Sequence, residues 1–325
     1  MITFFYRNRN VGFSIAKVSN TITNLIEDKE IFEVPSSRAM PISIIRNLLY
    51  IRRHRNKKDI NHIVGDIHYG ILVLRGCLSV LTVHDTSSYD NENNVIKKII
   101  VKYLWYVWPL KYASKIVCIS QSTKKSIERF TKRSDIIVIH NAIDHHYTYY
   151  EKMFNAECPH ILIVGTAYNK NIERTVNALC GLRCRVSIIG HLTETQIGLL
   201  EMNKINYCNK FNLTEKEMLE EYRQCDIVCF CSLYEGFGMP IIEANAIGRV
   251  VITSKLSSIY EVADDSVLYV DPYNIKDIHD GINLLITDVS LRNRLIHNGQ
   301  NNIKRFLPEN ILEKYLQIYK QIKGA

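Results

Sequence analysis

The sequence predicts an α/β protein built from two doubly wound domains. Short strands rich in β-branched and apolar residues alternate with amphipathic, helix-like stretches along the whole chain. The strands are almost continuously apolar, as expected for parallel sheets that helices cover on both faces. The chain has 325 residues, which is too long for one typical core and favours two domains.

The expected elements follow from this alternation. The predicted strands are 2–6, 31–34, 60–64, 77–83, 115–119 and 135–139 in the first half and 160–164, 184–189, 204–208, 226–231, 250–253 and 266–270 in the second. The predicted helices with the clearest periodicity are 14–27, 41–54, 94–112, 121–131, 274–287, 290–305 and 309–322. No repeat of fixed period and no low-complexity segment interrupts them.

A polar, aromatic and aperiodic stretch at 145–157 marks the expected domain boundary. We predict a first Rossmann-like domain at 1–150 and a second at 151–308. A final helix at 309–325 follows Pro308 and can cross back to the first domain. Two such domains facing each other would place a site in the cleft between them, among the loops that follow the strands.

Composition narrows the class of protein. Apolar residues make up 46% of the chain and charged residues 23%, as in an ordinary globular protein. No apolar run is long enough to span a bilayer, and the N-terminal sequence does not have the order of a signal peptide. Nine cysteines without a repeated spacing suit a reducing compartment, so we expect a cytoplasmic protein. Cys180 and Cys184 lack a second ligand pair, and no metal site is predicted.

The positive charge is concentrated in the first half. Residues 1–152 hold 23 Lys and Arg against 13 Asp and Glu, whereas the rest hold 18 against 20. The densest cluster, RRHRNKK at 52–58, is either a solvated helix end or a face that meets an anionic surface. Since no nucleic-acid module is recognisable, a membrane surface or an anionic lipid-linked substrate is the favoured form of the second interpretation.

Polar residues follow two of the predicted strands. His84 and Asp85 come directly after the fourth strand, where a histidine fixed by a backbone hydrogen bond is the structural alternative to a functional one. Gly165 follows the seventh strand and permits close backbone approach, and Lys170 lies near the next helix start. Because the helix dipole disfavours a cation there, an anionic ligand would explain Lys170 better than stability does. Neither a dinucleotide fingerprint nor a Walker sequence is present.

The stretch YEGFGMPIIEANAIG at 234–248 follows the tenth strand. Gly236 and Gly238 can turn their amides toward a ligand, and Pro240 suits the first turn of a helix whose N-terminus favours phosphate. Glu235 and Glu243 can only accept hydrogen bonds when ionised, and sugar hydroxyls are natural donors. Together these residues predict a ligand that is both a polyol and a phosphate ester, as a nucleotide sugar is.

These residues resemble retaining glycosyltransferases of family 4, which have the GT-B fold of two Rossmann-like domains. The resemblance rests on SLYEGFGMPIIEANAIG, on VITS, SSIYEV and LYVDP after it, and on two glutamates separated by seven residues. It extends backward through CDIVCFC, VIHNAID, CISQSTKKSI and the VHD turn. It therefore covers nearly all of the second half and, more loosely, the first.

The resemblance implies a role for each matching residue. Glu235 would bind hydroxyls of the donor sugar, Glu243 would hold the ribose, and Lys170 would neutralise the diphosphate leaving group. His84 would lie near the anomeric carbon, so that His84, Lys170 and Glu235 form the expected catalytic set. The remaining expected donor contacts are Gly12, Gly165, Thr166, Gly236, Phe237, Gly238 and Met239.

Two departures from the family pattern are visible. The family usually has an arginine directly after the glycine of the seventh strand, where this chain has Thr166. The first glycine loop has one glycine, Gly12, where many members have two. These changes bear on how the phosphates and the acceptor are bound.

The activity that the resemblance implies is transfer of a sugar from a UDP- or GDP-sugar to a hydroxyl acceptor, with retention at the anomeric carbon and without a metal or other cofactor. The expected acceptor is a lipid-linked glycan intermediate of bacterial surface polysaccharide synthesis, reached at the inner face of the plasma membrane. Two alternatives share the scaffold: a nucleotide-sugar epimerase, and a non-catalytic nucleotide-sugar-binding protein.

Overall fold

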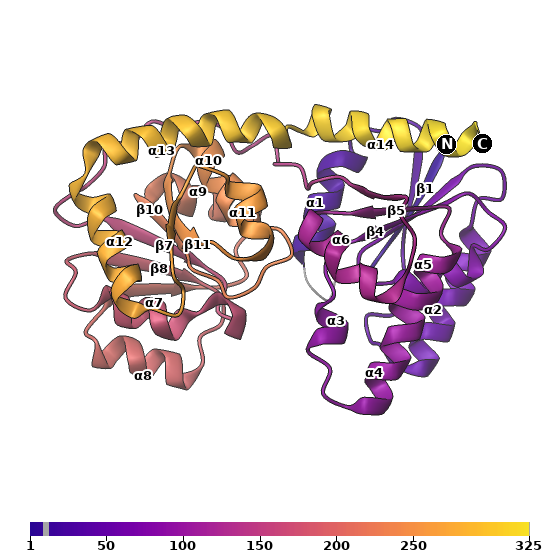
Figure 1. The fold of residues 1–325 in the computed structure, drawn as a ribbon, viewed down its shortest axis with the longest axis horizontal. Helices are drawn as coiled ribbons and strands as arrows, with labels where there is room; N and C mark the ends of the chain where they lie inside the picture. Colours follow the sequence, from indigo (N-terminus) through magenta and orange to yellow (C-terminus); the bar gives the residue numbers. More distant parts are fainter. Residues whose placement is uncertain (9–12, 325) are drawn as a thin grey trace. The chain divides into compact units, whose positions relative to one another are not determined.

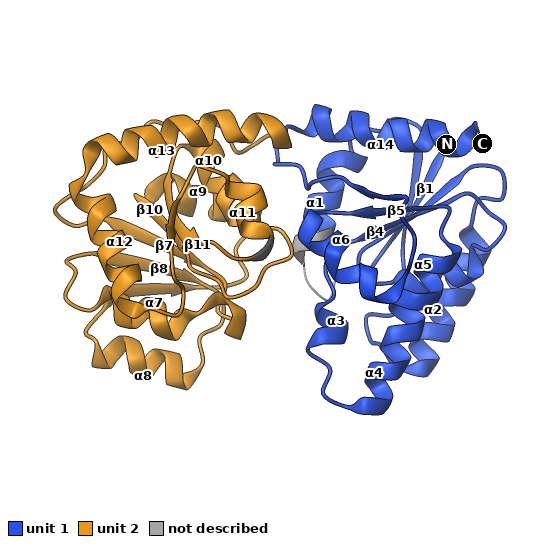
Figure 2. Cartoon of the chain, in the orientation of Figure 1, with its two compact units in different colours: residues 1–144, 307–325 blue, residues 145–306 orange. Residues whose placement is uncertain are grey.

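The computed structural model describes residues 1–8 and 13–324, and it divides the chain into two compact units. Unit 1 comprises residues 1–144 and 307–325, and unit 2 comprises residues 145–306 (Figure 2). The C-terminal helix thus belongs to the same unit as the N-terminal half of the chain. Among the described residues no helix is long and apolar enough to cross a membrane.

Unit 1 is built on a six-stranded sheet in the order β2-β1-β3-β4-β5-β6, with every pair parallel. The strands are β1 (Ile2–Tyr6), β2 (Lys29–Glu33), β3 (Ile60–Val64), β4 (Ser79–Val83), β5 (Lys115–Cys118) and β6 (Ile136–Val138). The helices are α1 (Phe13–Thr23), α2 (Pro41–His54), α3 (Ser87–Asp90), α4 (Val95–Val101), α5 (Trp108–Tyr112), α6 (Gln121–Ile127) and α14 (Pro308–Lys323), with shorter turns η1 (His68–Val73), η2 (Lys102–Val107) and η3 (Glu128–Phe130).

Unit 2 has a second six-stranded parallel sheet in the order β12-β11-β10-β7-β8-β9. Its strands are β7 (His160–Val164), β8 (Arg185–Ile189), β9 (Asn206–Lys210), β10 (Ile227–Phe230), β11 (Val250–Ser254) and β12 (Leu268–Val270). Its helices are α7 (Ile172–Leu179), α8 (Glu194–Met202), α9 (Glu215–Gln224), α10 (Met239–Ile247), α11 (Ser257–Ala263), α12 (Ile275–Thr287) and α13 (Val289–Asn302), with turns η4 (Tyr168–Lys170) and η5 (Ile303–Phe306) (Figure 1). The predicted α/β class with two doubly wound parallel sheets is confirmed.

The strand order of unit 2 indicates where this unit would bind a ligand. In unit 2, strands β8 and β9 follow β7 toward one edge of the sheet. Strands β10, β11 and β12 lie on the other side of β7, toward the opposite edge. The order reverses between β7 and β10, and ligands of open α/β sheets bind outside the carboxyl ends of the strands at such a reversal. The loops after β7 and β10 are the ones that begin at Gly165 and at Cys231.

The two faces of the unit 1 sheet carry separate apolar cores. One face packs against α1 and α14, whose buried residues include Ile22, Ile311 and Ile318. A hydrogen bond of 2.7 Å between His62 Nδ1 and the Tyr319 hydroxyl links α14 to the central strand β3. The other face packs against α2, η1, η2 and α5, with Trp105 and Tyr106 among the buried residues.

The stretch 94–112, predicted as one helix, is helical without a gap from Val95 to Tyr112, but its winding changes from α4 through the π-helical segment η2 to α5. Pro109 accounts for the change in winding, because it has no N–H to donate and its ring crowds the carbonyl four residues earlier. That carbonyl belongs to Trp105, and it shares a hydrogen bond of 2.8 Å with Nδ1 of the buried His68. A side chain from η1 is thus bonded to the carbonyl that cannot receive a hydrogen bond from Pro109.

Candidate active site

The loop after β7 brings Lys170 back over the end of its own strand. Gly165 has φ of 91°, and a Cβ built there would lie 2.8 Å from Lys170 Cε. The chain then forms the turn η4 and enters α7 at Ile172. Only glycine accommodates both this backbone conformation and the close approach of the lysine side chain.

The loop after β10 is tied to the β7 loop through its main chain. The Leu233 amide donates to the Asn169 carbonyl at 2.8 Å, and Asn169 Nδ2 donates to the Tyr234 carbonyl at 2.9 Å. From the other side, the Ser258 hydroxyl donates to the Glu235 carbonyl at 2.7 Å. Glu235 is thus held by residues of two neighbouring segments, and its position does not depend on its own loop alone.

Lys170 and Glu235 meet at the reversal of the strand order. Lys170 Nζ lies 2.5 Å from Glu235 Oε1, and the two side chains are only 19% and 14% exposed. The ammonium also lies 4.7 Å from the centre of the Phe230 ring. Lys170 precedes α7, where the helix dipole disfavours a cation, and the Glu235 carboxylate offsets that cost. Two residues that the resemblance assigned to different parts of the donor therefore form one ion pair.

Helix α10 begins directly after this pair. Gly238 has φ of 107° and caps the helix, and Pro240 lies in its first turn, as predicted. The positive end of the helix dipole therefore lies at the end of the Glu235 loop. The Phe237 side chain is buried and packs edge-on against Phe306, with ring centroids 5.8 Å apart. Any contact of Phe237 with a ligand would be made by its main chain.

Glu243 is on the second turn of α10 and is 8% exposed. Its Oε2 accepts a hydrogen bond of 2.7 Å from the hydroxyl of Tyr222 on α9. Burial and the neighbouring Glu243 carboxylate raise the pKa of Tyr222 well above its usual value, so that this tyrosine stays a donor. Tyr222 was not predicted as a site residue, and nothing in its local sequence marks it.

Thr166, which stands where the resemblance predicts an arginine, is hydrogen-bonded within unit 2 through both its side chain and its main chain. Its hydroxyl donates to the His191 carbonyl at 2.7 Å, and its own carbonyl accepts from Gln196 Nε2 at 3.1 Å. These bonds tie the end of β7 to the loop after β8 and to helix α8. A threonine side chain cannot supply the positive charge of the family arginine, and in this loop Lys170 is the cation placed against Glu235.

His84 belongs to unit 1 and is 9% exposed, directly after β4. It lines a cavity of about 30 Å³ together with His62, Thr82, His140 and Tyr319, a volume suited to one or two water molecules. Burial, followed by the neighbouring His68, lowers the pKa of His84 to about 4, while Asp85 acts in the opposite direction. The imidazole is therefore neutral at pH 7. The predicted donor contact Gly12 lies outside the described residues.

Unit 1 has a partly buried carboxyl group, that of Asp66, which was not predicted as a candidate site residue. Asp66 follows β3, and burial together with the Asp85 carboxylate raises its pKa to about 7, with Arg7 acting in the opposite direction. Its carbonyl accepts a hydrogen bond of 3.2 Å from the Trp105 indole. Asp66 lies just after a strand, as Asp85 does, so the same pattern could have been used to predict Asp66 as a candidate site residue.

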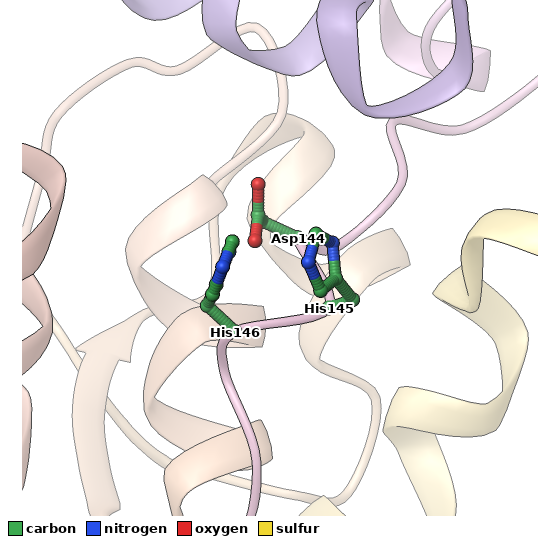
Figure 3. A group of neighbouring side chains, drawn as sticks. All are labelled: Asp144, His145 and His146. Atoms are coloured by element: carbon green, nitrogen blue, oxygen red, sulfur yellow. The ribbon is translucent and has the colours of Figure 1, made fainter. Parts of the chain in front are cut away.

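Three consecutive residues, Asp144, His145 and His146, bring possible metal ligands together (Figure 3). Their ligand atoms all lie within 4.8 Å of one another, and both histidines are exposed. The His145 and His146 rings lie close together, with centroids 3.9 Å apart. Such a row of neighbours in sequence supplies one side of a coordination shell only.

Comparison with known proteins identifies the class. The family model Glycosyltransferase Family 4 matches residues 23–147, and the model Glycosyl transferases group 1 matches residues 154–302. The Anabaena protein HepE, solved in complex with UDP-glucose, has a similar fold with a TM-score of 0.76, at 15% identity over 99% of this chain and all of that chain.

Two curated relatives are similar in sequence. The O-antigen chain mannosyltransferase RfbU of Salmonella typhimurium is 24% identical over 84% of this chain and 76% of its own length. An enzyme of Campylobacter jejuni, N,N'-diacetylbacillosaminyl-diphospho-undecaprenol alpha-1,3-N-acetylgalactosaminyltransferase, is 28% identical over 33% of this chain and 29% of its own length.

The fold, two units that are each built on a parallel, doubly wound sheet, is that of GT-B glycosyltransferases. The chain belongs to glycosyltransferase family 4, of the group 1 type.

Proposed function

We propose that the protein transfers a sugar from a nucleoside diphosphate sugar to a hydroxyl group of a lipid-linked glycan, with retention at the anomeric carbon. The observation that carries the proposal is the Lys170–Glu235 pair at the reversal of the unit 2 sheet. A cation and a carboxylate held together there match a ligand with phosphates at one end and hydroxyls at the other. The helix N-terminus at Met239 adds a second source of positive potential.

In the proposed reaction the bond between the anomeric carbon and the diphosphate oxygen breaks, and the acceptor oxygen bonds to the same face of that carbon. The departing diphosphate receives the acceptor proton. Lys170 and the α10 N-terminus stabilise the negative charge that develops on the diphosphate, which is the main requirement of such a step. They would fill the role that a metal ion has in other transferases. Glu235 orients the sugar hydroxyls, and Glu243 takes the ribose.

The relatives support the choice of substrate class. One is named as a mannosyltransferase of O-antigen chains and another as acting on a diphospho-undecaprenol-linked sugar. The fold neighbour HepE was solved with UDP-glucose. A surface polysaccharide intermediate on an anionic membrane fits these names and the basic first half of the chain. UDP-sugars and GDP-sugars are both candidate donors to be tested.

The test has two steps. A thermal-shift screen over nucleoside diphosphates finds the donor base, because a bound ligand raises the melting temperature by mass action. The matching nucleotide sugars are then incubated with and without lipid-linked acceptors, and the anomeric configuration of the product is read by NMR. A product with the donor's configuration supports the proposal. An inverted product contradicts retention, an isomerised nucleotide sugar formed without acceptor indicates an epimerase, and binding without turnover on any acceptor favours a non-catalytic protein.

A further inference from the structure

Helix α4 of unit 1 presents an unusual apolar surface. Val95, Ile96, Ile99, Ile100 and Tyr103 are 71%, 71%, 52%, 46% and 40% exposed. Positions three and four apart on a helix are neighbours, so these side chains form one continuous row that runs into η2. Single exposed apolar residues are normal, but a contiguous row of five marks a surface that meets an apolar partner.

Helix α2 repeats the pattern. Ile42, Ile45 and Leu49 are 82%, 56% and 60% exposed, whereas Ile44 and Ile51 of the same helix are buried. The spacing of three and four residues places the exposed side chains along one face, opposite the buried one. The row continues into basic residues at the C-terminal end of the helix, where Arg52 and Arg53 are exposed.

Both rows lie on the same side of the unit 1 sheet. Ile44 and Ile51 of α2 pack into the same apolar cluster as Trp105 and Tyr106, which continue the chain from α4. Both helices belong to unit 1, in the part of it farthest from α14 (Figures 1 and 2). The sheet core is therefore complete beneath these helices, and their outer faces are not needed to close it.

The charge around both rows has a single sign. Residues 36–58 contain seven Lys and Arg and no Asp or Glu, and residues 93–127 also contain seven Lys and Arg and no Asp or Glu. Lys97, Lys98 and Lys102 interleave with the apolar row of α4. An apolar helical face flanked only by lysine and arginine is complementary to an anionic bilayer, in which acyl chains receive the apolar side chains and headgroups pair with the cations.

We propose that the exposed faces of α2 and α4 dock on the surface of an anionic phospholipid bilayer. The proposal deepens the proposed function, on which it rests, because it names the surface where a lipid-linked acceptor would be met. A second copy of the chain is a poorer partner, since two faces with this excess of positive charge would repel each other. None of the residues that form the surface is part of the Lys170–Glu235 site.

The test uses the full chain in co-sedimentation with vesicles of equal parts phosphatidylcholine and phosphatidylglycerol, and with vesicles of phosphatidylcholine alone. The apolar contribution is removed with the double variant Ile96→Glu, Ile99→Glu, whose positions are exposed and tolerate a charge. The matched control is Met202→Glu, Val289→Glu, which changes two exposed apolar residues of unit 2 helices, 79% and 58% exposed. A third variant, Lys97→Gln, Lys98→Gln, Lys102→Gln, tests the charge.

We expect the wild type and the control to bind the mixed vesicles about ten-fold or more tightly than pure phosphatidylcholine, and the α4 glutamate variant to lose about ten-fold or more of that affinity. The lysine variant should weaken binding most at low salt, where screening is least. All variants should keep the thermal shift produced by the nucleoside diphosphate, which separates this proposal from the proposed function. Equal vesicle binding by the wild type and the α4 glutamate variant would overturn the proposal. So would a wild-type dimer in sedimentation velocity that this variant converts to a monomer.

Discussion

Lys170 Nζ and Glu235 Oε1 lie 2.5 Å apart, although 64 residues separate them along the chain. Each is held by its own loop at the carboxyl end of β7 or β10, the two strands between which the order of the unit 2 sheet reverses. The pair balances two partly buried charges. On our account a donor would exchange this bond for two others, since its diphosphate would bind the lysine and its hydroxyls the glutamate.

The position of Lys170 should depend on the missing side chain of Gly165. Gly165→Ala places a Cβ against the lysine stem and also strains a residue with positive φ. Gly181→Ala is a matched control, because Gly181 has φ of 82° and no atom within 4 Å of the new Cβ. We expect the control to lower the free energy of unfolding by about 1 kcal/mol. Gly165→Ala should cost about 1–3 kcal/mol more and weaken nucleotide binding.

These two variants are compared by urea denaturation and by titration with the nucleoside diphosphate. If Gly165→Ala matched Gly181→Ala in both measurements, the close packing of Lys170 on Gly165 would have no energetic consequence.

The Tyr222 hydroxyl should stabilise the fold through Glu243. Tyr222→Phe removes a hydrogen bond to a carboxylate that is 8% exposed, and we expect a loss of about 1.5–3 kcal/mol in the free energy of unfolding. Tyr168→Phe, at a side chain that is 84% exposed, should change stability little. Chemical denaturation of both variants measures the difference. Equal stabilities would show that the Tyr222 bond contributes nothing net.

Unit 1 should lose stability in mild acid because of its buried histidines. Burial lowers the pKa of His62 to about 3 and of His68 and His84 to about 4, from 6.5 in the unfolded chain. Between pH 4 and 6.5 the unfolded state binds more protons at these sites, so the free energy of unfolding rises with pH. Each contributes about 1.4 kcal/mol per pH unit where its two states differ fully.

Asp66 should oppose this trend. Its pKa is raised to about 7, so between pH 4 and 7 the folded state keeps a proton that the unfolded state releases, and its contribution falls as pH rises. Asp66→Asn should therefore steepen the acid-side rise by about 1.4 kcal/mol per pH unit. Asp135→Asn is the control, because Arg133 lowers the pKa of Asp135 and both states are ionised in this window. Denaturation at several pH values measures the slopes, and parallel slopes for wild type and Asp66→Asn would refute the assignment.

Local patterns were enough to predict the sheets. The runs 2–6, 60–64 and 160–164 were predicted as strands and form β1, β3 and β7 with those bounds, because a buried parallel strand needs a short, nearly continuous apolar run. The helix predicted at 94–112 forms, but its π-helical segment was not predicted although Pro109 was visible. The hydrogen bond between His68 and the Trp105 carbonyl joins residues that are distant in the sequence, and it was not predicted either.

The sequence predicted individual residues of the candidate site, but it did not predict which of them contact one another. Glycines, a proline helix start and two glutamates could be read within one segment, and the resemblance supplied their roles. The pairing of Lys170 with Glu235 and of Tyr222 with Glu243 depends on how strands and helices pack, which no local pattern records. The bond between the Thr166 hydroxyl and the His191 carbonyl likewise depends on packing and could not be predicted from the sequence.

The central claim, that Lys170 and Glu235 receive opposite ends of one donor, is tested most directly by calorimetric titration of Lys170→Ala and Glu235→Gln with UDP and GDP. We predict that Lys170→Ala weakens binding of the preferred nucleotide about ten-fold or more, since it removes a charge-assisted bond to the diphosphate. Glu235→Gln should bind that nucleotide at least as tightly as wild type, because it frees the lysine, while losing sugar transfer. Wild-type affinity in Lys170→Ala, with its fold intact by circular dichroism, would contradict the account.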